Sequence, residues 1–211
     1  VETVYCDVTY RRTGNLDQSL EHFEQTDDDY RYSVAWVDCL ASGASLGRSV
    51  LMLGNDAATA DLPRKARDRP LAVPARRKKS VPTCFPGFLL NAYSVKAFNR
   101  IYYARHGDGR RLVDYDRYFY PLDAVRHWNR IYGRRGFIQY QALFPPETSR
   151  RGLIELRETV AESRRASFLG VLKSSGPANR GMLSYLRPGH TLALDLKNTG
   201  DDLNRLVRRL D

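Results

Sequence analysis

The chain has 211 residues, 42% hydrophobic and 27% charged, which is typical of a soluble globular protein with one substantial core. No apolar run approaches the roughly 20 residues that a membrane-spanning helix needs, and the first residues show no charged-then-apolar signal sequence. The net charge of +10 suggests a polyanionic partner or surface, although solubility is the simplest explanation of charge alone.

The chain opens with a pattern of strand, helix and two further strands. Val4–Arg12 alternates apolar and polar residues and ends at a glycine turn, which indicates a strand. Asn15 and Gln18 have the spacing of a capping box and predict a short helix over Leu16–Phe23. Apolar, aromatic and β-branched residues predict the next strands, Tyr32–Leu40 and Ser49–Leu53, the second stopped by Gly54-Asn55.

A basic, proline-rich segment follows at Asp61–Pro86, with eight Lys or Arg residues and five prolines. It has too little apolar surface to order itself, which predicts a mobile loop. After it, the pattern predicts a helix at Ser94–Arg105 capped by Ser94, a strand at Leu112–Tyr120 and a short helix at Leu122–Tyr132.

The last third repeats the order strand, helix, strand, strand. Gly136–Phe144 alternates and stops at two prolines, and Thr148 can cap a helix that runs to about Ser163. The remaining predicted elements are strands at Ser167–Lys173 and Thr191–Leu196, a hairpin arm at Leu183–Leu186, and a last helix that opens at residues 199–202.

Two βαββ-like units therefore flank a helical and disordered middle within one domain, residues 1–211. Strands close to helices with short connections predict an α+β fold, with an antiparallel or mixed sheet covered by helices on one face.

No motif of a catalytic or cofactor centre is present in the sequence. The chain has no GxGxxG, GxxxxGK[ST], HExxH or GxSxG pattern. Cys6, Cys39 and Cys84 are widely spaced, and the four histidines show no ligand spacing, so neither a disulfide framework nor a metal site is indicated. We therefore expect no catalytic machinery in the chain on its own.

One strand has the residues of a binding surface. Gln139 and Gln141 lie two residues apart among apolar neighbours, so they project from the same face of a strand. Two amides in a row suit the hydroxyls of a sugar, although glutamine is also common on exposed sheet faces. Lys173, at the end of the next predicted strand, could lie beside them and meet a phosphate or an alkoxide.

Six short stretches of the chain are familiar as a set: Tyr32–Asp38, Leu46–Arg48, Trp128–Gly133, Gly136–Gln141, Phe168–Lys173 with Gly176-Pro177, and Pro188-Gly189 with Asp195. In this order they resemble the substrate domain of the decaprenylphosphoryl-β-D-ribose 2-oxidase family, which belongs to the vanillyl-alcohol-oxidase type of flavoenzyme. The similarity covers nearly the whole chain and is weakest from Asp61 to Tyr93.

The resemblance implies that this chain is the substrate-binding (cap) domain, and that FAD is bound by a domain that is absent from it. The implied reaction oxidises the 2-hydroxyl of a polyprenyl-phosphate ribose, for cell-wall arabinan, with a reductase partner that completes an epimerisation. The implied location is peripheral, on the cytoplasmic or periplasmic side of the cell membrane. Because anionic headgroups attract basic segments, we expect the Asp61–Pro86 loop to face the membrane.

The resemblance also implies site residues. Lys173 matches a catalytic lysine, and Gln139 and Gln141 match glutamines at the flavin. The other implied substrate-binding residues are Trp36, Arg130, Phe119, Ser175, Thr191 and Ala193.

Several of these positions depart from the family pattern. Phe119 stands for a tyrosine, Ser175 for a bulky aromatic residue, Thr191 for an asparagine, Ala193 for a cysteine, and His190 for a tryptophan at the pocket edge. The departures leave the exact sugar open.

Two other interpretations stay open. An aldonolactone or alditol oxidase shares the same architecture. A basic nucleic-acid-binding module is less favoured, because the basic segment has no interleaved stacking aromatics and no recognised binding motif.

Overall fold

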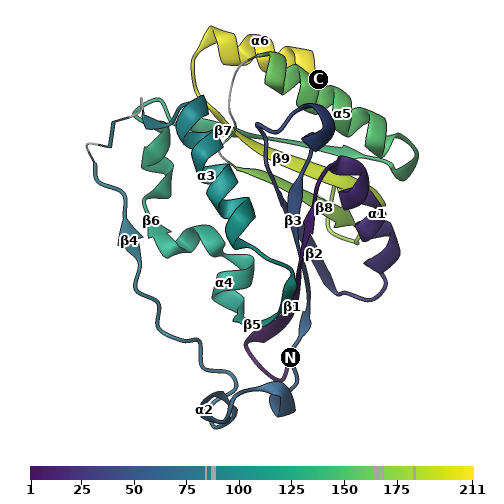
Figure 1. Ribbon diagram of the computed structural model, residues 1–211, viewed down its shortest axis with the longest axis vertical. Coiled ribbons are helices and arrows are strands. Elements are labelled where there is room, and N and C mark those ends of the chain that lie inside the picture. The colour runs from purple at the N-terminus through teal and green to yellow at the C-terminus, as the bar shows by residue number, and fades with distance from the viewer. Residues whose placement is uncertain (84, 87–88, 164–166, 168, 183) are drawn as a thin grey trace.

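One seven-stranded sheet, antiparallel between all neighbours, has the strand order β5-β1-β3-β2-β8-β9-β7 (Figure 1). The computed structural model describes residues 1–211 except 84, 87–88, 164–166, 168 and 183. The strands of this sheet are β1 (Tyr5–Thr13), β2 (Tyr32–Val37), β3 (Ser49–Asp56), β5 (Gly109–Asp114), β7 (Phe137–Phe144), β8 (Gly170–Ser175) and β9 (Gly189–Lys197). The α-helices are α1 (Leu16–Thr26), α2 (Arg64–Arg67), α3 (Ala92–Arg105), α4 (Tyr115–Phe119), α5 (Pro146–Glu162) and α6 (Asp201–Leu210).

The sheet consists of two units with the same connectivity, β1-α1-β2-β3 and β7-α5-β8-β9. In each unit the third strand lies between the first and the second. The units meet where β2 pairs with β8, through Ala35 opposite Leu172 and Trp36 opposite Val171. The predicted α+β class and the two βαββ units are therefore confirmed, and the large sheet is antiparallel rather than mixed.

Helices α1, α5 and α6 cover one face of the sheet, on the side opposite to α3 and α4 (Figure 1). Because side chains alternate between the faces of a strand, every second residue of each strand points to these helices, and those residues are mostly apolar. Burying each large apolar side chain contributes roughly 1.5–3 kcal/mol. This core includes Phe23, Leu51, Leu53, Leu153, Leu172, Leu192, Leu194 and Leu196, each at most 2% exposed.

The predicted start of α1 is confirmed. The Asn15 side chain accepts a hydrogen bond from Gln18 N at 2.9 Å, and Gln18 Oε1 accepts one from Gly14 N at 2.7 Å. These two bonds satisfy donors that would otherwise lack partners at the helix start.

On the opposite face, α3 and α4 lie over the first unit, and the 3-10 helix η5 (Trp128–Tyr132) packs on Phe137 of the second. The Tyr102 ring of α3 packs on the Trp36 ring, with centroids 4.5 Å apart. The Tyr118 hydroxyl of α4 donates to Met52 O at 3.0 Å and lies over Gly54, where an added Cβ would be 2.9 Å from it. The described strand residues of the second unit on this face include the exposed side chains Gln139, Gln141 and Lys173.

The middle of the chain differs from its predicted elements. The strand expected at Leu112–Tyr120 ends at Asp114, because the Asp114 side chain accepts from Arg117 N at 3.1 Å and caps α4. The helix expected at Leu122–Tyr132 is instead two 3-10 helices, η4 (Pro121–Ala124) and η5 (Trp128–Tyr132). Between them lies the short strand β6 (Val125–Arg126).

Two predicted helix caps are also wrong. Helix α3 is capped by Asn91, whose side chain accepts from Ser94 N at 3.1 Å, so Ser94 lies inside the helix. Helix α5 begins at Pro146, before Thr148, since proline needs no partner for a backbone N–H in the first turn.

Three strand predictions need adjustment. Strand β3 continues through Gly54-Asn55 to Asp56, and β8 begins later than Ser167 and extends to Ser175. Of the predicted hairpin arm, Leu183 lies outside the described residues, and residues 184–186 are not in a strand. Phe168, within the predicted β8, also lies outside the described residues.

The basic segment Asp61–Pro86 is attached to the domain at several points. Leu62 is 1% exposed, and Pro70 O accepts from Val4 N at 2.9 Å. The short strand β4 (Lys79–Ser80) pairs in parallel with β6, and Val81 beyond it is buried. Cys84 lies outside the described residues, and the mobility of the segment stays a prediction.

Candidate functional site

A polar row lies in the second unit, on the sheet face that α1, α5 and α6 do not cover. The register places Val171 of β8 opposite both Trp36 of β2 and Ala193 of β9, and Ala193 opposite Gln141 of β7. Four neighbouring strands therefore bring these side chains into one line across the sheet. We call this line, with the pairs on either side of it, the polar row.

The two flanking pairs supply most of its polar groups. Lys173 pairs with Thr191 on one side, and Gln139 pairs with Asp195 on the other. The predicted placement of Gln139 and Gln141 on one face is confirmed, and Lys173 lies on the same face. All three of these long side chains are exposed, whereas Trp36 is 5% exposed.

Asp195 orients the amide of Gln139. Gln139 Nε2 donates to Asp195 Oδ1 at 3.0 Å, and the Tyr132 hydroxyl donates to Asp195 Oδ2 at 3.3 Å. An ionised carboxylate only accepts hydrogen bonds, so the amide nitrogen faces Asp195 and the Gln139 carbonyl oxygen is left to accept from a ligand.

Electrostatics at Asp195 are set by burial. Asp195 is 1% exposed, and desolvation raises the pKa of its carboxyl group, while the hydrogen bonds from Gln139 and Tyr132 lower it. Burial, together with the nearby Asp195 charge, strongly raises the pKa of the Tyr132 hydroxyl. Tyr132 therefore stays a neutral donor that holds the carboxylate in place.

Gln141 has a similar arrangement with a partner that the sequence did not indicate. Its Nε2 donates to the hydroxyl of Tyr185, a half-exposed residue in the segment before β9. The carbonyl oxygen of Gln141 is thus also left to accept. Neither Tyr185 nor Asp195 was among the predicted site residues. The register of β7 and β9 places Asp195 beside Gln139, whereas the Tyr185 contact depends on the path of the segment before β9.

The small residues of the predicted site lie at the Lys173 end of the polar row. The Thr191 and Ser175 hydroxyls are 2.7 Å apart, and Thr191 is 2% exposed. Ala193 is half-buried in the middle of the row. Lys173 projects from β8 beside these residues, as a positive charge with access to a ligand.

The remaining predicted residues are not brought into the row. Phe119 of α4 packs edge-on against Tyr32 at 4.9 Å, and Tyr32 lies about 13 Å along β2 from Trp36 at roughly 3.3 Å per residue. Arg130 of η5 donates to Val81 O at 3.0 Å. Both residues are therefore at the periphery.

His190 corrects one expectation. His190 immediately precedes Thr191 on β9, so its side chain points to the other face of the sheet, which α1, α5 and α6 cover. There its Nδ1 lies 2.8 Å from the Ser149 hydroxyl of α5. It is 6% exposed, and burial lowers its pKa. It therefore belongs to the core and not to the pocket edge.

Within the described part of the chain, no three His, Cys, Asp or Glu side chains are grouped so as to hold a metal ion. No helix in this part has the length and apolar character required to cross a bilayer.

Comparison with known proteins identifies a relative along the whole chain. No protein-family model matches it. The decaprenylphosphoryl-β-D-ribose oxidase of Mycolicibacterium smegmatis is 32% identical over 215 residues, which cover 100% of this chain and 46% of that protein. The chain thus spans about half the length of this curated relative. The resemblance seen in the sequence is confirmed: over its whole length, the chain is a homologue of part of decaprenylphosphoryl-β-D-ribose oxidase.

Proposed function

We propose that this chain is the substrate-binding domain of an FAD-dependent oxidoreductase that oxidises a secondary alcohol of a sugar. The substrate in this proposal is a polyprenyl-phosphate ribose, oxidised at its 2-hydroxyl in the synthesis of cell-wall arabinan precursors. The relative is named as an oxidase of decaprenylphosphoryl-ribose, and the similarity extends along the whole chain. A reductase partner and a membrane-facing basic segment are parts of the same proposal.

The polar row is the observation that carries this proposal. Gln139 and Gln141 each use the amide nitrogen within the protein, so both leave a carbonyl oxygen as an acceptor on one surface. The hydroxyls of a sugar are donors that can pair with such acceptors. Val171 and Ala193, both half-buried, add an apolar floor on which the carbon side of a sugar ring can lie, and Trp36 is buried beneath Tyr102 at its edge.

In this proposal FAD lies next to the polar row but is bound by residues outside this chain. The sequence has no glycine-rich loop that could hold a pyrophosphate, so the row offers one wall of a pocket, and another part of the protein has to bind FAD. When bound there, FAD supplies the acceptor for the hydride. Gln139, Gln141 and Lys173 are the residues of this chain that would face it across the substrate.

Lys173 has the charge that the reaction needs. Oxidation of an alcohol removes the hydroxyl proton, so negative charge develops on the oxygen as the reaction proceeds. A fixed ammonium group next to that oxygen stabilises the developing charge more than it stabilises the neutral alcohol. The glutamine carbonyl oxygens would hold the other hydroxyls and so orient the sugar.

The test uses the full-length flavoprotein with a polyprenyl-phosphate ribose. Lys173→Ala and Gln141→Ala should each lower turnover by about 10²-fold or more, the usual effect of losing a group that acts on the transition state. Their unfolding midpoints should change little, because both side chains are exposed.

Matched controls separate a site effect from a general one. Arg208→Ala on α6 removes an exposed positive charge, and Gln25→Ala on α1 removes an exposed amide; both should leave turnover unchanged. Wild-type turnover in both row variants would refute the assignment of this surface. Equal activity on a free alditol or an aldonolactone would instead favour the alternative oxidase.

A further inference from the structure

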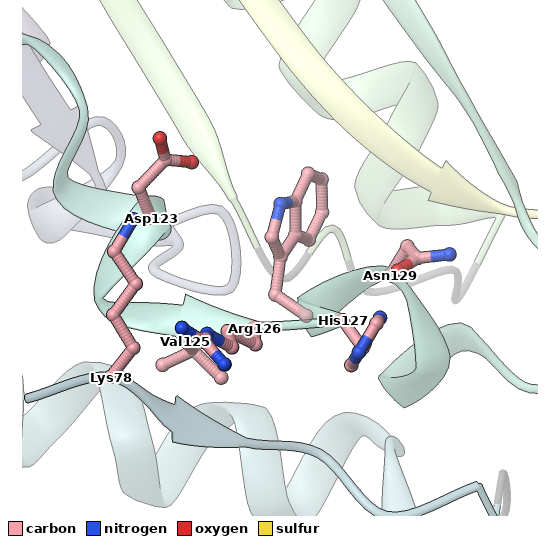
Figure 2. Close-up of a pocket in the computed structure, with 7 residues that line it drawn as sticks. Lys78, Asp123, Val125, Arg126, His127 and Asn129 are labelled. Carbon is pink, nitrogen blue, oxygen red and sulfur yellow. The ribbon is translucent and has the colours of Figure 1, made fainter.

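A hollow of about 340 Å³ lies where the basic segment meets residues 123–129 (Figure 2). The pairing of β4 with β6 joins its two walls, and Val81 N donates to Arg126 O at 3.0 Å. Arg130 adds a third link through its bond to Val81 O. Segments about 50 residues apart in the chain are thus held side by side.

Several consecutive residues line this hollow. All residues from Val125 to Asn129 line it, although successive side chains of a regular strand point in opposite directions. His127 breaks the alternation, because its φ of 57° lies in the left-handed region. Among the described non-glycine residues it is the one with positive φ, a conformation that tends to occur where a site requires it.

The lining has positive charge without a neutralising partner. Within the described part of the chain, the side chains of Lys78, Arg126 and His127 form no ion pair or hydrogen bond. Several exposed arginines elsewhere on the surface are paired, as Arg31 is with Asp56 at 2.7 Å. The carboxylate of the lining, Asp123, points away from Arg126 and His127 in Figure 2.

Two aromatic rings link the hollow to the Gln139 end of the polar row. Trp128 lines the hollow, and its ring packs against the Phe137 ring with centroids 5.2 Å apart. Phe137 lies two residues before Gln139 on the same face of β7, a distance of about 7 Å along the strand. A single ligand could therefore contact both places.

We propose that this hollow binds the phosphate group of a phosphorylated ligand while the polar row holds its sugar. Lys78 and Arg126 supply permanent positive charge, and His127 and Asn129 supply further N–H donors, a set that suits phosphate oxygens. The volume lies at the lower end of the range for small-molecule sites, which is enough for a phosphate and its ester oxygen. The sugar half of this inference rests on the proposed function.

The test is isothermal titration calorimetry of the full-length protein, which measures dissociation constants for inorganic phosphate, ribose 1-phosphate and farnesyl phosphate. Lys78→Gln with Arg126→Gln should weaken binding of each by about tenfold or more, the value of one lost charge-assisted bond. The charge-matched control is Lys79→Gln with Arg134→Gln, which alters exposed neighbours outside the lining. An equal loss in the control pair, or no phosphate binding by the wild-type protein, would overturn the inference.

The three probes distinguish the sources of the phosphate. Tighter binding of farnesyl phosphate than of the other two, lost in the hollow variant, would support a lipid-linked ligand. Equal binding of all three, lost in the same variant, would support a site for free phosphate esters.

The sugar site and the phosphate site can be refuted independently of each other. Gln141→Ala should lower turnover and leave the binding of inorganic phosphate unchanged. If that variant loses turnover while the hollow variant binds phosphate normally, only the phosphate site is refuted. If the hollow variant loses phosphate and Gln141→Ala keeps its turnover, only the sugar site is refuted.

Discussion

Asp38, just beyond β2, holds a buried polar network beside the Trp36 end of the polar row. It is 1% exposed, and its carboxylate accepts from Arg48 Nε at 2.8 Å, Asn99 Nδ2 at 2.6 Å and Leu40 N at 3.0 Å. Asn99 belongs to α3, so this carboxylate links the loop after β2 to the helix that packs on Trp36.

Asp38→Ala should lower the free energy of unfolding by about 3–5 kcal/mol, the usual cost of removing one partner of a buried ion pair. The Arg48 side chain is 26% exposed, so water can reach part of it, but Asn99 is 1% exposed. Asn99 Oδ1 already lacks a hydrogen-bond partner, so the variant would leave the whole amide unsatisfied.

Urea denaturation of the 211-residue chain at pH 7, followed by circular dichroism, measures this loss as a lower midpoint. The control is Asp17→Ala, which removes an exposed pair with Arg150 at 2.6 Å and should cost about 0–1 kcal/mol. A loss for Asp38→Ala no larger than that of the control would refute the argument that burial makes this network strong.

Three further predictions concern the second unit. Burial raises the pKa of Asp195 above its ordinary 3.8, so the folded chain binds this proton more tightly than the unfolded chain, and the free energy of unfolding should fall as pH rises from 3.8 through the raised pKa. If the difference in unfolding free energy between the wild-type chain and Asp195→Asn does not vary with pH, this prediction is contradicted. Gly189→Ala should destabilise the chain by about 3 kcal/mol or more in urea denaturation, since its φ is 145° and the new Cβ would lie 2.1 Å from Phe144 O, whereas Gly107→Ala, with no atom within 4 Å, should be neutral. The thiol introduced by Ala193→Cys should react with a maleimide faster than the buried Cys6 and Cys39, whose pKa values burial raises. Peptide mapping by mass spectrometry measures the three rates, and an introduced thiol that reacts as slowly as Cys6 and Cys39 would mean that this face of the sheet is covered.

The sequence by itself determined the class of fold and the connectivity of the two units. Alternating strands and capped helices are local patterns, so β1, α1, β7, α5 and β9 could be recognised from neighbouring residues alone. The same period of two predicted that Gln139 and Gln141 share a face. The resemblance to an oxidase family could also be read from the sequence, because it depends on short stretches in register.

Only the tertiary structure decided how the strands pair, and therefore which residues meet. Asp195 lies next to Gln139 because β9 pairs with β7 in one register, and a shift by one residue would have turned His190 to the polar face instead. Helix ends depended on single hydrogen bonds, such as that from Arg117 N to Asp114, which compete with strand propensity. The hollow at Lys78 and Arg126 arises from a contact across about 50 residues, and such contacts are set by the packing of the whole chain, which no local pattern encodes.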